Sequence, residues 1–523
     1  MSIVYLIGAG PGDPGLITVR GMQCLASADV VLHDHLVNAR LLRYARPDAE
    51  KIDVGLAAPQ GLEQEAICIL LAEKAREGKT VARLKWGDPF VFDSGGAEGL
   101  FLHEHGIRFE VVPGIPVCFA APAYAGVPVT YSGGGDTITL IRGYEDEGKA
   151  ERDIDVDWTS LARLDGTIVC YAGPQQLPHI VKSLLSHGRP PEEPAAIVDY
   201  GTLPTQNTLA GTLAELSDAM QKEAPRRAAV LIVGRVAALR EHLRWYDERP
   251  LFGKRVLVTR PQGQAAELVD GLESMGAEVV EAPMLRIEPP DDWGPLDDAC
   301  ATIGRFSWIV FSSTNAVDAF LERLLRGDRD LRVLGGVKLC CVGSTTAERL
   351  AERGLKADVV PGEYRGEALV EALGDARSLS GARILLPHAD IAREVIATEL
   401  RKHGADVTEV VAYRTVATDA EREGDPDVYR MLLERKLDVV TFTSPSAVRN
   451  LVRVLGAEPA ADLLRTTTVA SIGPVTAEAA AQCGILTTVM PEKYTVAALV
   501  GAIVRYFETD PARATSHEQR VTL

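Results

Sequence analysis

The sequence predicts an α/β protein of several domains, in which strands and helices alternate along most of the 523 residues. Three observations lead to this prediction. Short apolar runs alternate with longer stretches of helical periodicity, a pattern typical of layered α/β folds with largely parallel sheets. The length suits about three domains. The second half of the chain also repeats its own pattern, which predicts two similar lobes there.

Eight apolar runs are predicted as strands, because each is short and ends in a polar or glycine-containing turn. In the first half they are ADVVLHD, KTVARLKW, RFEVVPG, GTIVCYAG and RAAVLIVGRV, and in the second half KRVLVTRP, FSWIVFSS and KLCCVGS. The charged segment 244–255 carries Pro250 and Gly253 and precedes a new strand. It therefore predicts a domain boundary.

The first strand runs into the glycine loop IGAGPGD. A dinucleotide fingerprint needs a third glycine where Asp13 stands, and Pro11 and Pro14 prevent a helix from running through the loop. Asp13 followed by Pro14 instead predicts an N-cap and a helix over GLITVRGMQCLAS. The glycines indicate that backbone approaches a ligand closely, but not a dinucleotide.

Composition and charge narrow the class of partner. The net charge of −18 argues against nucleic acid and means that an anionic substrate must be held by local donors. No apolar run approaches the roughly 18 residues of a membrane span. The eight cysteines show no C-x-x-C spacing and most lie in apolar runs, which predicts buried thiols in a reducing cytoplasm and no metal site. The polar tail, 509–523, is predicted to be disordered.

The internal repeat of the second half rests on three pairs of segments. FSWIVFSSTNAVDAF pairs with LDVVTFTSPSAVRNL, CVGSTTAERLAERG with SIGPVTAEAAAQCG, and KRVLVTRPQGQAAELV with ARILLPHADIAREVIA. All three pairs keep the same order and an offset of about 130 residues, which indicates a duplicated unit. Chance similarity between α/β segments would not keep one offset three times.

Four predicted strand ends in this half share one design, SSTNAV, GSTTAE, TSPSAV and GPVTAE. Small hydroxyl residues or glycine at a helix start offer free N–H and O–H donors to an anion without any lysine. Taken singly, each is explained as an ordinary N-cap; four together favour a polyanionic ligand in a cleft between lobes. The candidate substrate-binding residues are Ser313, Thr314, Asn315, Ser344, Thr345, Thr443, Ser444, Ser446, Gly473 and Thr476.

The second half resembles uroporphyrinogen-III synthases in VFSSTNAVDAF, LLPHADIAREVIATELRKHGADVTEVVAYRTV, VTFTSPSAVRNL and SIGPVTAEAAAQCG. The resemblance covers roughly 253–508 and implies a two-lobed enzyme that closes linear hydroxymethylbilane into uroporphyrinogen III and needs no cofactor. It places the family's candidate catalytic tyrosine at Tyr413, for which a strand position near the lobe hinge is the alternative. Arg393 either reaches a substrate carboxylate or is a solvated helix residue.

The first half resembles the tetrapyrrole methyltransferases, most closely uroporphyrinogen-III C-methyltransferase, in YLIGAGPGDPGLIT, RLKWGDPFVFDSGGAE and DYGTLPTQNTLAGTL. The resemblance implies two methyl transfers from S-adenosylmethionine to ring carbons, and a homodimer through this half. It makes Asp34 the proton acceptor; for the flanking His33 and His35, loop histidines are favoured over metal ligands. The cofactor-binding positions that it implies are Pro11, Gly87, Asp88, Val91, Pro116, Val117, Ala172 and Gly201.

Several positions depart from that family's pattern. Leu56 replaces a lysine taken as proton donor, Trp86 a glycine, Ser94 an arginine and Ala97 an acid. Pro116 and Val117 also stand for Thr-Ala, and Ala172 for a methionine. Backbone contacts to S-adenosylmethionine survive such changes, whereas the loss of an arginine–carboxylate pair weakens substrate binding by about 1.5–3 kcal/mol.

The expected organisation is a methyltransferase-like domain over 1–245, a linker over 246–252 and a synthase domain over 253–508. The synthase lobes are expected at about 253–288 plus 415–508, and at 289–414. The expected function is a bifunctional cytoplasmic enzyme of tetrapyrrole biosynthesis that acts on small molecules. Two alternatives stay open. One is a synthase whose first half is degenerate and serves binding or assembly, and the other is a two-lobed anion-binding module without chemistry.

Overall fold

A computed structural model gives the structure of the chain. It describes residues 2–55, 61–143, 156–222, 228–260, 265–282, 285–326, 329–361, 366–373, 379–390, 395–417, 427–455 and 457–509. The chain divides into two compact units. The first holds the described residues up to Val256, Val269–Val279 and those from Val500 on, and the second holds Leu257–Leu268 and Val280–Leu499.

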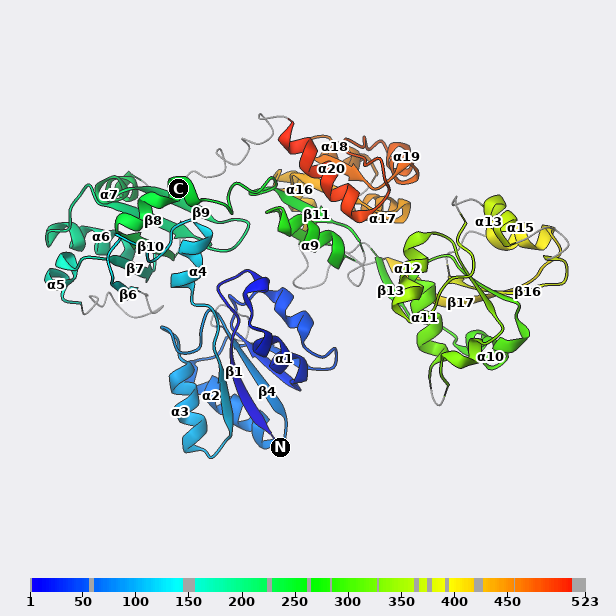
Figure 1. Ribbon diagram of the computed structural model, residues 1–523, viewed down its shortest axis with the longest axis horizontal. Coiled ribbons are helices and arrows are strands. Elements are labelled where there is room, and N and C mark those ends of the chain that lie inside the picture. The colour runs from blue at the N-terminus through cyan, green and yellow to red at the C-terminus, as the bar shows by residue number, and fades with distance from the viewer. Residues whose placement is uncertain are drawn as a thin grey trace. The chain divides into compact units, whose positions relative to one another are not determined.

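The first sheet has five parallel strands in the order β3-β2-β4-β1-β5. They are β1 (Ile3–Gly8), β2 (Val30–His33), β3 (Glu50–Asp53), β4 (Thr80–Lys85) and β5 (Phe109–Val112). Successive residues such as Leu6 and Ile7 point to opposite faces, so the sheet builds two cores. Helix α1 (Val19–Ser27) covers one face, and α2 (Gln64–Arg76) and α3 (Gly95–Glu104) cover the other (Figure 1).

Because these strands are parallel, the loops that follow β1, β2, β4 and β5 all leave the same edge of the sheet. These loops carry Pro11, Asp34, the Trp86–Asp88 turn and Gly114. The topology thus gathers four loops, far apart in the sequence, at one edge.

The second sheet has the order β6-β7-β10-β8-β9, and only β6 and β7 are parallel. Its strands are β6 (Ile138–Gly143), β7 (Thr167–Ala172), β8 (Pro194–Asp199), β9 (Asn207–Thr212) and β10 (Ala229–Val233). Its core on one face comes from α6 (Gln176–Ser186) and α7 (Leu213–Lys222), and on the other from α4 (Val117–Tyr124). The shorter α5 (Trp158–Arg163) and α8 (Arg240–Leu243) complete this region.

The expectation of largely parallel sheets is therefore wrong for the second sheet. The turn between β8 and β9 spans only residues 200–206, and a parallel connection needs a crossover of a dozen or more residues. A short turn between neighbouring strands can only make an antiparallel pair.

The third sheet has the order β12-β11-β18-β19. Its strands are β11 (Arg255–Val258), β12 (Glu278–Glu281), β18 (Val439–Phe442) and β19 (Thr468–Ser471). Helix α17 (Pro445–Leu455) packs against Phe442 and Val440 in the core. The other helices are α9 (Ala266–Ser274), α16 (Val428–Leu433), α18 (Ala457–Leu464), α19 (Pro474–Gln482) and α20 (Val496–Glu508).

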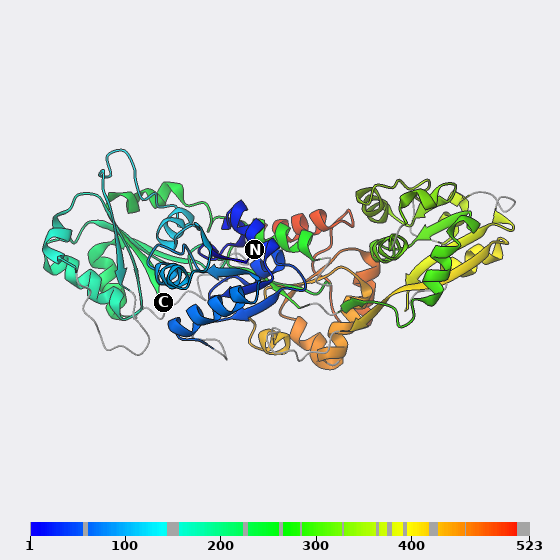
Figure 2. The ribbon, with the colours of Figure 1, turned by 90° about the horizontal axis from the view of Figure 1, so that it is seen from below.

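The fourth sheet has the order β13-β17-β16-β14-β15, and β13 alone runs antiparallel to its neighbour. Figure 2 shows its green and yellow strands side by side. They are β13 (Leu285–Glu288), β14 (Trp308–Phe311), β15 (Lys338–Cys341), β16 (Arg383–Ala389) and β17 (Asp406–Ala417). Helices α10 (Gly294–Ala301), α11 (Thr314–Leu324) and α12 (Ser344–Glu352) cover one face, and α13 (Gly366–Leu373) and α15 (Val395–Lys402) the other.

The eight runs predicted as strands all contain strands: β2, β4, β5, β7, β10, β11, β14 and β15. The helix predicted directly after Asp13 begins later than expected. Asp13 caps only a 3₁₀ turn over Pro14–Leu16, and α1 starts at Val19, where Thr18 accepts the N–H of Gly21 at 3.0 Å. Extended backbone at Ile17 separates the two.

The cysteines are free thiols, and all but the half-buried Cys483 are buried. Within the described ranges, no helix has the length and apolarity that crossing a bilayer requires. The predicted tail, 509–523, lies outside the described residues apart from Thr509.

Candidate functional site

The four predicted hydroxyl-rich junctions each lie between a strand and a helix. The first and second connect β14 to α11 and β15 to α12, and the third and fourth connect β18 to α17 and β19 to α19. The duplicated segments therefore form matching strand–helix units, each with a helix N-terminus directly after a strand.

At the first junction, three predicted residues come together around one hydroxyl. The Oγ of Ser313 lies 3.0 Å from the hydroxyl of Tyr413 and also accepts the N–H of Ala316 at 3.1 Å, which caps α11. Asn315, one residue into α11 after Thr314, also hydrogen-bonds Tyr413. Hydrogen bonds thus connect the phenol of Tyr413 on β17 to the start of α11, the helix that follows β14.

Tyr413 lies on β17 with only 8% of its surface exposed. Burial raises the pKa of its phenol, while hydrogen bonds to Ser313 and Asn315 lower it in part. The backbone oxygen of Tyr413 accepts the N–H of Asp390 at 3.1 Å, which joins β17 to the residue that follows β16. The net upward shift keeps the phenol protonated, so that it can donate a hydrogen bond.

The other junctions hold the remaining candidates. Ser444 caps α17 by accepting the N–H of Ala447 at 3.2 Å, with Thr443 half-buried before it and Ser446 exposed after it. Gly473 precedes α19, whose Thr476 is buried. Ser344 and Thr345 form the first turn of α12, and Arg393 lies outside the described residues.

In the first half, three loops approach one another at the level of the backbone. Gly10 and Gly87 exchange two hydrogen bonds, of 3.1 and 2.8 Å. A Cβ on Gly8 would lie 2.4 Å from Cα of Gly114, and one on Gly114 would lie 2.2 Å from the oxygen of Gly87. Only glycine fits at these contacts, which hold the loops after β1, β4 and β5 directly against one another.

Of the implied cofactor-binding positions, Asp88 and Gly201 make contacts within the protein, whereas Gly87 faces open space. The carboxylate of Asp88 accepts the N–H groups of Phe90 at 2.8 Å and Gly114 at 2.9 Å, so it ties two loops together. A Cβ on Gly201 would lie 2.3 Å from Cβ of Ala121, which makes Gly201 a packing residue against α4. Gly87 has φ +72° and only open space where a Cβ would point.

The other implied positions lie close to the second core. Ala172 is fully buried at the end of β7, and Val91 and Val117 pack on the core beneath α4. Pro116 caps α4, and its carbonyl accepts the N–H groups of Phe119 and Ala120 at 3.1 Å. These residues thus serve core packing and helix capping.

Asp34, the implied proton acceptor, is held by a buried arginine. One carboxylate oxygen pairs with the guanidinium of Arg83, and the other accepts the backbone N–H of Trp86 at 3.0 Å. Burial opposes the charged form of Asp34, but Arg83, Lys85 and the Trp86 N–H outweigh it and lower its pKa. Asp34 is therefore a carboxylate near neutral pH.

Arg83 connects Asp34 to a network of buried charged side chains, which the sequence motifs did not predict. Glu98 is fully buried, and its Oε1 lies 3.2 Å from Nε of Arg83 and 3.0 Å from Nζ of Lys85. Lys85 also contacts Asp93 at 3.0 Å and Ser94 at 2.9 Å. The cations outweigh the desolvation of Glu98 and lower its pKa, whereas burial raises the pKa of Asp93 despite Lys85.

The sequence carried a signal for this network. Arg83 and Lys85 stand two residues apart in the otherwise apolar strand β4, and residues i and i+2 of a strand share one face. Two cations on one face of a buried strand require acidic partners.

Trp86 joins the glycine loop to the second sheet. Its Nε1 donates to the carbonyl of Pro11 at 3.0 Å, and its ring centroid lies 5.4 Å from that of Tyr171 on β7. The indole thereby occupies space beside the Pro11 loop. Leu56 lies outside the described residues, and Ala97 lies in the first turn of α3.

The two histidines beside Asp34 have local partners. The Nδ1 of His33 lies 3.2 Å from the carbonyl of Asp34, and the Nδ1 of His35 lies 3.0 Å from Asp53. In the part of the chain that the structure describes, no three His, Cys, Asp or Glu side chains gather as metal ligands.

Comparison with known proteins assigns a family to each half. Residues 3–217 match the model of the tetrapyrrole (corrin/porphyrin) methylases, and residues 266–501 match that of uroporphyrinogen-III synthase HemD. The chain is 37% identical over 503 residues to the porphyrin biosynthesis protein HemD of Ruminiclostridium josui, covering 96% of this chain and 97% of the relative.

Two further similarities cover part of the chain. The uroporphyrinogen-III C-methyltransferase of Bacillus subtilis (strain 168) is 37% identical over 353 residues, covering 67% of this chain and 72% of the relative. A crystal structure of uroporphyrin-III C-methyl transferase from Thermus thermophilus complexed with S-adenyl homocysteine is 37% identical and covers 46% of this chain and 100% of its own, with a TM-score of 0.39. Because the Ruminiclostridium relative matches along nearly its whole length, the chain belongs to the HemD family in which a tetrapyrrole methylase domain is fused to a uroporphyrinogen-III synthase domain.

Proposed function

We propose that the second half, 253–508, closes hydroxymethylbilane to uroporphyrinogen III, and that the first half, 1–245, methylates this product at ring carbons. The observation that supports the synthase role best is the hydrogen-bonded pair of Tyr413 and Ser313 at a helix start. Helix N-termini and hydroxyl groups suit a substrate with many carboxylates in a protein whose net charge is −18.

In ring closure, the terminal hydroxyl of the linear substrate leaves as water and a carbon–carbon bond closes the ring after the last pyrrole is inverted. Tyr413 donates its proton towards the departing oxygen, and Ser313 and Asn315 hold the phenol in place. The raised pKa of Tyr413 keeps this proton available. The hydroxyl-rich junctions hold substrate carboxylates, with Ser344, Thr443, Ser446 and Gly473 in this role, and Arg393 binds a further carboxylate.

The residues of the first half fit S-adenosylmethionine, which would supply an electrophilic methyl group. The open space at Gly87 and the peptide groups of the three glycine loops form a cradle that a Cβ would fill. Pro11, Asp88, Pro116 and Gly201 fix the loops that line this cradle. Asp34, held ionised by Arg83, accepts the proton that a methylated ring carbon must lose.

A second function has one observation in its favour. Trp86 contacts both Pro11 and Tyr171, and so narrows the space beside the cofactor loop. This contact favours a first half that has lost methyl transfer and serves binding or assembly. The resemblance to the methyltransferases supports a homodimer through this half, which light scattering on the full chain tests.

One experiment tests both activities. The full-length protein is incubated with hydroxymethylbilane, with and without S-adenosylmethionine, and the oxidised products are separated as isomers and weighed by mass spectrometry. Type III isomer supports the synthase, and products heavier by two methyl groups support the methyltransferase. Type I isomer alone, which forms without an enzyme, would refute the synthase role.

A further inference from the structure

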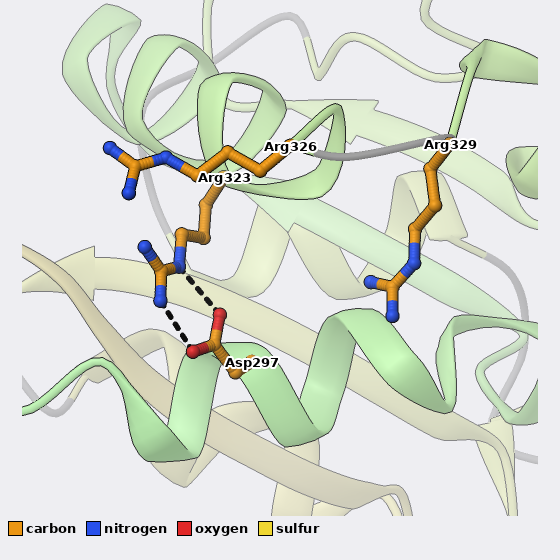
Figure 3. A pocket seen from close by; sticks show the side chains of 4 residues that line it. All are labelled: Asp297, Arg323, Arg326 and Arg329. Carbon is orange, nitrogen blue, oxygen red and sulfur yellow. Dashed lines mark hydrogen bonds and ion pairs between the residues drawn. The ribbon is translucent and has the colours of Figure 1, made fainter.

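A surface pocket of about 460 Å³ lies on the α10–α11 side of the fourth sheet. Asp297, Arg323, Arg326 and Arg329 line it (Figure 3). Asp297 comes from α10, and Arg323 from the last turn of α11. Arg326 and Arg329 follow α11, so the pocket joins the two helices at one end.

The charges in this pocket do not balance. The guanidinium of Arg323 makes two contacts of 2.5 Å with the carboxylate of Asp297, as Figure 3 shows. Arg326 and Arg329 make no ion pair with any residue that the structure describes. The pocket thus holds two positive charges beyond its own carboxylate, in a chain whose net charge is −18.

The arginines are also partly pre-positioned. The guanidinium carbons of Arg323 and Arg326 lie 4.5 and 5.8 Å from the ring centroid of Trp293, within reach of a cation–π contact. The hydrogen bond of Arg323, with the charges of Arg326 and Arg329, also lowers the pKa of Asp297. Three guanidinium groups line one pocket, although those of Arg326 and Arg329 point in different directions (Figure 3). Like charges in one pocket repel one another, and bound anions reduce this repulsion.

The pocket is far from the candidate reaction site on the same lobe. Ser313, which contacts Tyr413, is the N-cap residue just before α11, and Arg323 lies in the last turn of this helix. Eleven helical residues span about 16 Å at 1.5 Å per residue. The pocket and the Ser313–Tyr413 pair therefore lie at opposite ends of α11.

We propose that this pocket binds a small molecule that carries at least two anionic groups, carboxylate or phosphate. Arginine presents donors in a planar fork that matches such oxyanions in pairs. Arg326 and Arg329 each receive one anionic group, while Arg323 stays anchored on Asp297. Two sources offer this chemistry, a polycarboxylate such as a tetrapyrrole and a condensed phosphate.

The test measures binding to the full-length protein by isothermal titration calorimetry, with inorganic pyrophosphate as one probe and uroporphyrin I, an octacarboxylate, as the other. In the Arg326→Gln/Arg329→Gln variant we expect affinity for the bound probe to fall at least about tenfold. Arg332→Gln is the matched control, because Arg332 is an arginine of the same segment that is already paired with Asp330 and highly exposed. Its binding should equal that of the wild type.

The outcomes separate the sources. Binding of pyrophosphate alone identifies a phosphate ligand, and binding of uroporphyrin I with loss of one site per chain in the double variant identifies a polycarboxylate. Thermal unfolding and type III product formation should be unchanged in the double variant, which separates this site from the synthase reaction. Absence of binding by both probes at millimolar concentration, or equal affinity in wild type and double variant, would overturn the proposal.

Discussion

The hydroxyl of Tyr413 lies 3.0 Å from Oγ of Ser313, although 100 residues separate the two in the sequence. The contact joins β17 to the first turn of α11, and Ser313 serves both as helix cap and as partner of the phenol. A hydroxyl that is buried, protonated and fixed in direction can deliver a proton to a leaving oxygen.

Tyr413→Phe should slow formation of type III isomer by about 10²–10⁴-fold if the phenol is a general acid. Folding stability should fall by only about 0.5–1.5 kcal/mol, the net value of one hydrogen bond. The rate is measured with saturating hydroxymethylbilane. Tyr429→Phe, at an exposed tyrosine of α16, is the control and should keep the full rate. An unchanged rate in Tyr413→Phe would leave Tyr413 as a structural strand residue.

Arg83→Met should lower the free energy of unfolding by about 3–5 kcal/mol, because it leaves the carboxylates of Asp34 and Glu98 without their shared buried cation. Urea unfolding measures the loss. Arg20→Met is the matched control, since Arg20 pairs with Glu110 on the exposed surface and its loss should cost little. Equal unfolding midpoints for the two variants would show that the buried network contributes no stability.

The same network should depend on pH. The pKa values of Asp34 and Glu98 are lowered from ordinary values of 3.8 and 4.5, so their stabilising effect is full above the ordinary values and is lost as the pH falls through the lowered ones. The pKa of Asp93 is raised, so ionisation of this carboxyl lowers the stability of the fold as the pH rises above its ordinary pKa of 3.8. The stability gap between wild type and Arg83→Met should therefore narrow on acidification below about pH 4. A gap that widens there would contradict the assigned charges.

Trp86→Gly should raise the affinity for S-adenosylmethionine about tenfold or more, because it removes the indole that bridges Pro11 and Tyr171. Calorimetry on the full chain measures the change. Trp86→Phe keeps a ring but loses the N–H, and should give an intermediate value. If the affinity falls in Trp86→Gly instead, Trp86 lines the cofactor site. Absence of binding in all three proteins would contradict cofactor use.

The thiols should be inert in the native protein. Burial raises the pKa of Cys170 and Cys340 to about 12, and that of Cys118 to about 11. Because the thiolate is the reactive form, a disulfide reagent at about pH 8 should modify only the half-buried Cys483 at an appreciable rate. Mass spectrometry identifies the modified residue. Cys483→Ser should abolish this phase, and rapid modification of Cys170 would show that the second sheet opens.

Short segments of the sequence correctly predicted strands and helix starts, because these features depend on interactions between residues close in the chain. Apolar runs such as GTIVCYAG predicted strands, and the hydroxyl-rich junctions predicted helix starts, because period and capping act over a few residues. The start of α1 was placed too early because Asp13 and Thr18 are both good caps, and only the extended residue between them decides which one begins the helix.

The sequence by itself determined the α/β class, the duplicated units of the second half and the family of each half, since motif order and spacing carry these. The tertiary structure decided which residues meet. It brought Tyr413 into contact with Ser313, and it made the second sheet mostly antiparallel. It also paired Arg83 with Asp34 and Lys85 with Glu98. Such contacts depend on the order of strands in a sheet and on which face each side chain takes. Both are set by packing between segments far apart in the chain, which no local pattern encodes.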